Sequence, residues 1–211
     1  MNIYKIMSKS LLSLITCFFL ATSWLVSAEN MSEPQTLVKN ASDKMLKALE
    51  DNQAELEKSP EKIYSLVEDI LMPYFDFEKM SKLALGKNWR QLDKEQRVQF
   101  VEEFRLLLIR TYSTAMLEYT NEEIRLLPFR DDVSRKRVTV PMEVIQPAGP
   151  SIPMALSLFQ NDSSEWKVYD VKIDGISLVT NYRSSFATEI RNKGVDSLIS
   201  DLAERNAKLK S

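Results

Sequence analysis

The spacing of apolar positions changes twice along this chain. From residue 34 to residue 119 apolar side chains recur every three or four residues, which is typical of amphipathic helices. From residue 122 to about residue 179 they alternate with polar residues, which is typical of strands. The helical spacing returns after Asn181. Helices, then consecutive strands, then helices indicate an α+β fold.

The strongest helical pattern covers residues 94–119. Asp93 is followed three residues later by Gln96, which predicts an Asp form of the capping box at the start of this helix. Weaker helical patterns cover 34–58 and 77–85, and Gly86 is suited to end the second of these. The stripe on the 94–119 helix is rich in large apolar residues, so we expect it to be buried: Phe100, Phe104, Leu107, Leu108, Tyr112 and Met116.

Four strands are predicted, around Ile124–Leu126, Val138–Val144, Ile152–Leu158 and Trp166–Val179. Pro141 predicts an edge strand or a bulge in the second of them. In the fourth, the alternation slips between Val168 and Tyr169 and Gly175 interrupts it, which predicts a bulge or a strong bend. Because the turns are short, we expect a four-stranded, curved antiparallel meander between N-terminal and C-terminal helices.

Residues 1–28 have the pattern of a secretory signal peptide. Lys5 and Lys9 precede an apolar stretch from Leu11 to Val26, and Val26-Ser27-Ala28 offers small residues for cleavage. The alternative is a retained membrane anchor, but the apolar stretch is shorter than the roughly 20 residues that span a bilayer. We therefore expect an exported protein, cleaved after Ala28, whose residues 29–211 form a single domain in the periplasm.

The composition excludes several classes of function. The chain has no histidine, and its one cysteine, Cys17, lies in the predicted signal peptide. Catalytic triads and imidazole metal sites are therefore excluded, and we expect no metal and no cofactor. The net charge is −2, and the predicted signal peptide contains two lysines and no acidic residue. The exported part is thus more acidic than the whole, which argues against nucleic-acid binding.

Candidate reacting groups are few. Asp170, Lys172 and Asp174 alternate along the fourth strand and would share one face of it. This face is either solvated or holds an acid–base pair, with Tyr169 or Tyr182 nearby, in a periplasmic enzyme. Arg183 could bind an anionic headgroup or pair with one of these carboxylates. Arg90, next to Trp89, is a second candidate for headgroup binding or docking.

The large apolar residues allow another reading. Met and aromatic side chains cluster on the central helix, the middle strands and the helix after Asn181, where they either fill an ordinary core or line a deformable apolar cavity. From the apolar faces we predict a pocket between helices and sheet lined by Leu83, Phe100, Phe104, Leu107, Leu108, Tyr112, Met116, Val140, Met142, Met154, Leu156, Val171, Ile173, Ile176, Leu178, Tyr182 and Phe186.

Two segments of the chain resemble the MlaC family, also called the toluene-tolerance family. The first, Pro73–Leu117, contains Phe75-Asp76, Leu85-Gly86 and Trp89-Arg90. The second, Trp166–Asn206, contains the run from Trp166 to Asp170, then Gly175-Ile176-Ser177-Leu178 and Asn181-Tyr182-Arg183. The region 122–160 matches only in its strand pattern.

The resemblance implies a phospholipid carrier without catalytic activity. Such a protein would exchange phospholipid, as cargo, with an outer-membrane lipoprotein–porin complex. On the other side it would exchange with an inner-membrane ABC transporter complex, through the substrate-binding MCE component of that complex. The acyl chains would lie in the apolar pocket and the headgroup largely outside it. The enzyme with Asp170 or Asp174 as base remains the alternative.

Overall fold

A computed structural model describes residues 31–118 and 121–208 of the chain, and Met31–Ser211 form one compact unit. The predicted signal peptide lies outside the described residues. Six α-helices are described: α1 (Glu33–Leu56), α2 (Lys62–Ile70), α3 (Phe77–Leu85), α4 (Lys94–Ser113), α5 (Leu178–Lys193) and α6 (Val195–Lys208). Short 3-10 helices join them: η1 (Met72–Tyr74), η2 (Gly86–Gln91), η3 (Thr114–Glu118) and η4 (Val133–Arg135).

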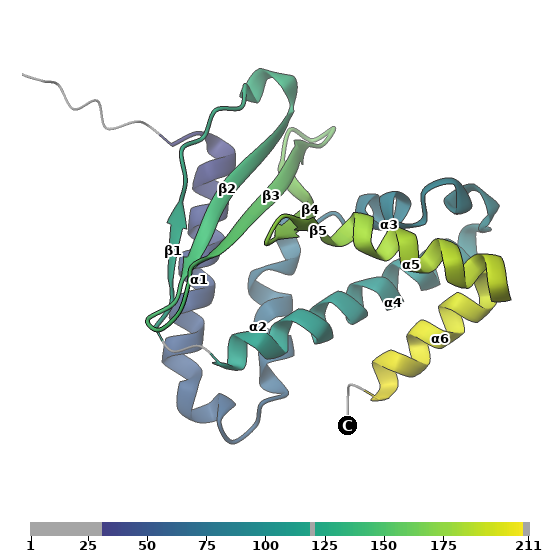
Figure 1. The fold of residues 1–211 in the computed structure, drawn as a ribbon, viewed down its shortest axis with the longest axis horizontal. Helices are drawn as coiled ribbons and strands as arrows, with labels where there is room; N and C mark the ends of the chain where they lie inside the picture. The colour runs from purple at the N-terminus through teal and green to yellow at the C-terminus, as the bar shows by residue number, and fades with distance from the viewer. Residues whose placement is uncertain (1–30, 119–120, 209–211) are drawn as a thin grey trace, which may run out of the picture. The chain divides into compact units, whose positions relative to one another are not determined.

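The strands form one antiparallel sheet in the order β1-β2-β3-β4-β5, so the predicted meander is confirmed (Figure 1). Their bounds are β1 (Glu123–Leu126), β2 (Arg137–Ile145), β3 (Ile152–Gln160), β4 (Trp166–Ile173) and β5 (Ile176–Ser177). The described sheet has five strands instead of four because the last predicted strand turns back at Asp174-Gly175. Both turn residues have positive φ, 50° and 78°, which suits a tight hairpin turn.

The prediction from Pro141 was wrong. β2 pairs with both β1 and β3, and its register with each is continuous. The strand tolerates proline because β1 ends at Leu126, opposite Met142. The carbonyl of Pro141 accepts a hydrogen bond from Leu127 N, beyond the end of β1. Since the N and C=O of one strand residue point to the same side, the missing N–H also lies where regular pairing has stopped.

The predicted irregularity in β4 is confirmed. Leu158 pairs with Val168 and Ser157 pairs with Asp170, so Tyr169 is the extra residue of a β-bulge. The bulge lets Val168 and Val171 face the same side of the sheet, although the two residues are three apart. It also turns the Tyr169 ring toward the ring of Phe159 on β3, with their centroids 5.9 Å apart.

Side-chain caps fix where the helices begin. The capping box predicted at α4 is present: Asp93 Oδ1 accepts from Gln96 N, and Gln96 Oε1 accepts from Asp93 N, both at 2.9 Å. At α5, Ser177 Oγ accepts from Thr180 N at 3.0 Å. This helix therefore starts at Leu178, earlier than the expected start after Asn181.

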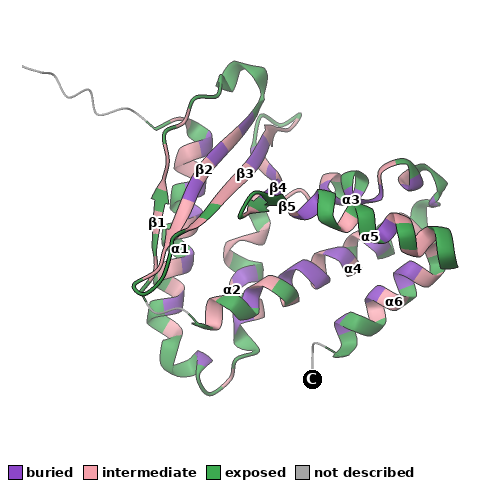
Figure 2. Ribbon diagram, in the orientation of Figure 1, coloured by how far each residue is buried: buried purple, intermediate pink, exposed green. Residues whose placement is uncertain are grey.

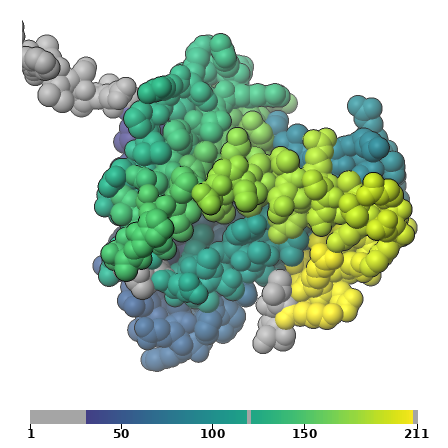
Figure 3. All heavy atoms as spheres, in the orientation of Figure 1, coloured from purple at the N-terminus to yellow at the C-terminus, as the bar shows by residue number. Residues whose placement is uncertain are grey.

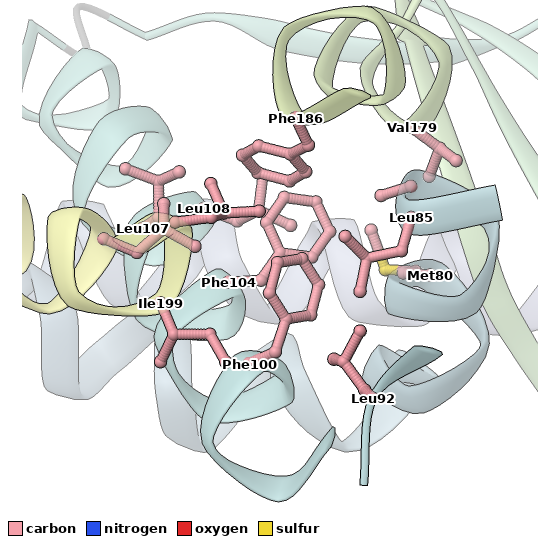
Figure 4. Packing of buried hydrophobic residues seen from close by; sticks show 13 residues of the cluster. Met80, Leu85, Leu92, Phe100, Phe104, Leu107, Leu108, Val179, Phe186 and Ile199 are labelled. Atoms are coloured by element: carbon pink, nitrogen blue, oxygen red, sulfur yellow. The ribbon is translucent and has the colours of Figure 1, made fainter. Parts of the chain in front are cut away.

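The buried apolar side chains form three clusters. The helical cluster lies between α3, α4, α5 and α6 and centres on Phe100, Phe104 and Phe186 (Figure 4). The sheet cluster joins β2, β3 and β4 to Val38 of α1. The α1–α2 cluster contains Met45, Leu49, Leu56, Ile63, Val67 and Ile109. None of the helices in the described ranges combines the length and the apolar character needed to cross a membrane.

Candidate apolar binding site

One face of the sheet is apolar over three adjacent strands. Between β2 and β3, the register places Val140 opposite Leu156 and Met142 opposite Met154. Between β3 and β4, it places Leu156 opposite Val171. Residues that are directly opposite in adjacent strands point to the same side of the sheet. Four more residues complete the face: Val138, Leu158, Val168 and Ile173. The first three belong to the sheet cluster, and Ile173 packs against it.

The cover over this face is uneven. At one end α1 lies against it, and Val138, Leu158 and Val168 are buried. Toward the other end Met154, Leu156 and Ile173 are only half-buried, although they lie on the same face. Figure 2 shows the change along β3, which is purple toward one end and mainly pink toward the other. An apolar surface that other side chains cover at one end only has room for an apolar ligand at the other.

The helical side of the site is formed by the end of α4. Tyr112 packs against both the helical cluster and the sheet cluster, and so does Phe75, which lies between η1 and α3. Among the described residues, these two aromatic side chains contact both the helical cluster and the sheet cluster. They therefore separate the closed helical core from the partly covered face of the sheet.

The hydroxyl of Tyr112 lies beside that of Tyr182 on α5. Burial raises the pKa of Tyr112 to about 12, and the neighbouring Tyr182 hydroxyl contributes to the shift. An aromatic array holds Tyr182 in place: its ring centroid is 5.2 Å from that of Phe104 and 5.3 Å from that of Phe186. The Tyr182 ring meets the Phe104 ring edge to face, at 75°, and is tilted by 31° relative to the Phe186 ring, so two contacts orient it. The site thus has two oriented hydroxyl groups on an otherwise apolar wall.

A separate small cleft, with polar Gln53 and Glu57 also in its lining, lies between α1 and η3. Its volume is about 260 Å³, close to the lower limit for small-molecule pockets. Met116 and Leu117 of η3 line it together with Leu49 and Leu56 of α1. Because methionine adapts its shape easily, Met116 is suited to a wall that moves when a ligand enters.

Comparison with known proteins agrees with this architecture. A family model described as "MlaC protein" matches residues 39–204, which is most of the chain. The chain belongs to the MlaC family.

Two relatives of this MlaC-family protein match nearly the whole chain. The intermembrane phospholipid transport system binding protein MlaC of Haemophilus influenzae is 26% identical over 192 residues, 88% of this chain and 89% of the relative. The toluene tolerance protein ttg2D of Pseudomonas putida is 31% identical over 193 residues, 91% of this chain and 86% of the relative.

A solved structure is also similar to this MlaC-family protein. It is the phospholipid-binding protein from Ralstonia solanacearum, determined in complex with a phospholipid. Its TM-score to this chain is 0.79 at 31% sequence identity, over 85% of this chain and 100% of that one. The helices and the curved antiparallel sheet therefore form the α+β fold of a phospholipid-binding protein.

The structure separates the predicted pocket residues of this MlaC-family chain into groups. Tyr182 packs against the helical cluster, in which the following are buried: Phe100, Phe104, Leu107, Leu108 and Phe186. The sheet cluster includes or contacts Val140, Met142, Met154, Leu156, Val171, Ile173 and Leu178. Tyr112 joins these two groups, and Met116 packs against the α1–α2 cluster.

Two predicted lining residues lie at the surface. Leu83 on α3 is 37% exposed and Ile176 on β5 is 62% exposed. Ile176 belongs to the β4–β5 hairpin, which is at the surface with the start of α5 in the space-filling view (Figure 3). Ile176 pairs with the half-buried Ile173 and therefore lies next to the apolar face. Leu83, by contrast, is on the exposed side of α3.

The two predicted headgroup or docking residues are both exposed. Arg90 lies on η2. The guanidinium of Arg183 lies against the backbone at Gly86, where α3 passes into η2. Neither arginine forms an ion pair within the described part of the chain, so both remain available for an anionic group; their role stays a prediction.

The two aspartates of the enzyme hypothesis are not brought together as an acid–base pair. Asp170 is buried, and its carboxylate accepts from Ser177 Oγ at 2.7 Å and from Val179 N at 3.1 Å. Asp174 is exposed in the hairpin turn. Asp170 thus fixes the start of α5 on the sheet. In the described ranges, no group of three or more potential ligand residues could hold a metal ion.

Sequence reasoning missed the part of the site that comes from α1, Phe75 and β1. Leu37 and Val38 of α1 and Phe75 contact the sheet cluster, and so do Ile124 and Leu126 of β1. The β1 residues could have been found, because their alternation matches that of β2, with which they pair. The apolar stripe of α1 indicates which face of the helix is buried, but not that its Leu37 and Val38 end packs against the sheet.

Proposed function

We propose that this protein is a carrier that takes up phospholipid and transports it between two membranes through the periplasm. The observation that supports this most directly is the half-covered apolar face formed by Met154, Leu156 and Ile173. The solved relative was determined with a phospholipid bound, and the Haemophilus influenzae relative is named for intermembrane phospholipid transport.

The energetics of lipid transfer favour a protein with such a face. Exposing a lipid with roughly 30 methylene groups to water would cost on the order of 24 kcal/mol, at about 0.8 kcal/mol for each group. Free diffusion of phospholipid through an aqueous compartment is therefore negligible. A carrier needs an apolar surface that covers most of the acyl chains, and it needs no reacting group.

The location and the partners extend this proposal. The signal-peptide pattern of residues 1–28 supports export to the periplasm. We propose that the carrier exchanges lipid with an outer-membrane lipoprotein–porin complex on one side. On the other side it would meet an inner-membrane ABC transporter, through the MCE component of that transporter. Crosslinking of the carrier to each complex in intact cells tests these partners separately.

Binding without catalysis is favoured over the enzyme hypothesis. A general base must reach a substrate proton, but both oxygens of the buried Asp170 carboxylate already accept hydrogen bonds that hold α5. Asp174 is in an exposed turn, where no neighbour shields it from water. We therefore propose that the protein releases its lipid chemically unchanged.

The test is native mass spectrometry of the purified exported protein, followed by organic extraction and lipid analysis. We expect one or more phospholipid masses on the wild-type protein. Met154→Glu places a carboxylate on the apolar face and should abolish the lipid adduct. Ala155→Glu is the matched control, because Ala155 points to the opposite face and lies opposite Lys172. A wild-type protein that carries no lipid and gains none from vesicles would contradict the proposal.

A further inference from the structure

We propose that the hydroxyl groups of Tyr112 and Tyr182 donate a hydrogen bond to an ester carbonyl oxygen of the bound phospholipid. The pair would thus recognise acyl esters at the point where the tails join the glycerol backbone. This inference rests on the carrier function proposed above and adds the residues that position the lipid along the apolar face.

The location of the pair carries the first part of the argument. Tyr112 contacts the sheet cluster directly, so its ring forms part of the wall opposite the half-covered face. Both tyrosines are half-buried and lie on different helices, α4 and α5. The rings of Phe104 and Phe186 hold Tyr182 on the helical side. The Tyr112 ring is therefore at the junction between the closed core and the sheet, and the Tyr182 hydroxyl beside it belongs to a ring that is held in place.

The second part is an account of hydrogen-bond donors. Two hydroxyl groups carry two hydrogens, and a bond within the pair uses at most one of them. In the described part of the chain neither hydroxyl donates to a carbonyl or a carboxylate group. At least one donor thus has no acceptor from these groups beside a half-buried apolar wall, and it needs a new acceptor when a ligand displaces the water there. An acceptor on a ligand would satisfy it.

The third part is the chemistry of the ligand. Below its headgroup a diacyl phospholipid has ester carbonyl groups, which accept hydrogen bonds and donate none. When the acyl chains enter an apolar site, these carbonyls lose water and need donors from the protein. A tyrosine on an apolar wall suits this position, because its ring contacts the chains and its hydroxyl supplies the donor.

The experiment compares two lipids on the full exported protein. The probes are a phosphatidylglycerol with two ester-linked chains and its analogue with two ether-linked chains of the same length, which lacks both carbonyls. Affinities are measured by native mass spectrometry titration on delipidated protein. Wild type should bind the ester lipid about fivefold to tenfold more tightly than the ether lipid, the size expected for one hydrogen bond.

Removing the hydroxyls should remove this preference. Tyr112→Phe and Tyr182→Phe should each weaken ester binding by about fivefold to tenfold and leave ether binding unchanged. Tyr64→Phe is the matched control, because Tyr64 packs against the α1–α2 cluster instead. It should change neither affinity.

Each of the remaining outcomes contradicts a specific part of the proposal. If wild type binds both lipids equally and Tyr112→Phe changes neither affinity, the pair only joins α4 to α5 and the inference is wrong while the carrier function stands. Equal weakening of both lipids in the variants would also contradict ester recognition. If wild type binds neither lipid, the carrier function itself fails, and the inference fails with it.

Discussion

The guanidinium of Arg183 lies so close to Gly86 that residue 86 has no room for a Cβ atom. A Cβ built there would come within 2.5 Å of Arg183 Nη2 and 2.7 Å of Nε. Gly86 also has φ +55° and ψ −124°, a backbone conformation that other residues avoid. The end of α3 and the exposed face of α5 are therefore fitted to each other through one glycine and one arginine.

Gly86→Ala should destabilise the protein through both effects. The backbone conformation alone should cost about 1–3 kcal/mol, and the displaced Arg183 side chain adds to it. When Arg183 is replaced by alanine, only the cost of the backbone conformation remains. Gly86→Ala should therefore lower the free energy of unfolding less in the Arg183→Ala variant than in wild type. Urea unfolding of the two single variants and the double variant measures the difference. The same cost in both backgrounds would mean that Arg183 moves away freely.

The two aspartates of the last hairpin should respond differently to substitution. Asp170→Asn removes the carboxylate charge and replaces one accepting oxygen with a donor, so the charge-assisted bonds from Ser177 Oγ and Val179 N are weakened, and the free energy of unfolding should fall by about 1–3 kcal/mol. Asp174→Asn should change it by less than about 0.5 kcal/mol, because the side chain is exposed and asparagine tolerates the positive φ. Urea unfolding curves of both variants test this.

The Asp170→Asn variant also tests whether Asp170 takes part in function. If Asp170 only fixes the start of α5, Asp170→Asn should retain whatever lipid the wild type carries at temperatures well below its unfolding transition. An equal loss of stability in both variants would show that the hydrogen bonds of Asp170 do not stabilise the native state.

Lys79 offers a third test, because its ammonium group lies between two aromatic rings. Lys79 Nζ is 3.4 Å from the ring centroid of Phe159 and 5.9 Å from that of Tyr169. Burial lowers the pKa of Lys79, and the neighbouring Arg137 lowers it further. In a double-mutant cycle, Lys79→Met and Phe159→Leu should show a coupling of about 0.5–2 kcal/mol.

The control for this cycle is a looser contact of the same kind. Lys82 Nζ is 5.7 Å from the ring of Trp89, and Lys82 is exposed and paired with Glu78. The cycle of Lys82→Met with Trp89→Leu should give a coupling below about 0.5 kcal/mol. If the coupling of Lys79 to Phe159 is no larger than this, the close approach contributes nothing to stability.

The bulge at Tyr169 shows how much of the fold the sequence predicts. A slip in the alternation between Val168 and Tyr169 is visible in the chain itself, because the face of every residue in a strand follows from its parity. The strong bend predicted from Gly175 is present as the hairpin at Asp174-Gly175, but the separate strand β5 was not predicted, since apolar residues continue beyond the glycine with similar spacing. There Ser177 caps α5 and donates a hydrogen bond to the buried Asp170 carboxylate, so a helix begins at Leu178 where the strand was expected to continue.

The candidate site was predictable in its residue types but not in its geometry. Val140 and Met154 occupy equivalent positions in alternating patterns, yet the first is completely buried and the second is half-buried. Met142, directly opposite Met154, is also buried, so the difference depends on which side chains of other elements cover each position, and no local pattern encodes that. The meeting of Tyr112 with Tyr182 likewise depends on how α4 packs against α5. Tertiary packing, rather than periodicity, therefore decides which part of the apolar surface stays open.

The raised pKa of Tyr112 leads to a prediction about alkaline pH. The ordinary pKa of a tyrosine is 10.0, and in the folded protein that of Tyr112 is about 12. As pH rises from about 10 to about 12 the unfolded chain releases this proton and the folded one keeps it, so the free energy of unfolding decreases over this range. The stabilisation is complete below pH 10 and is lost as pH passes the folded-state value.

Tyr112→Phe removes this titrating group. The free energy of unfolding of the variant should therefore fall less than that of wild type between pH 10 and pH 12. Urea unfolding at several pH values measures the two slopes, and Tyr64→Phe controls for the removal of one tyrosine elsewhere. Because Tyr112 is only half-buried, water screens part of the effect, and the difference between wild type and variant should stay well below the full value of the shift. Parallel pH dependences for wild type and Tyr112→Phe would contradict the desolvation of this hydroxyl. They would also weaken the argument that a lipid carbonyl replaces water beside it.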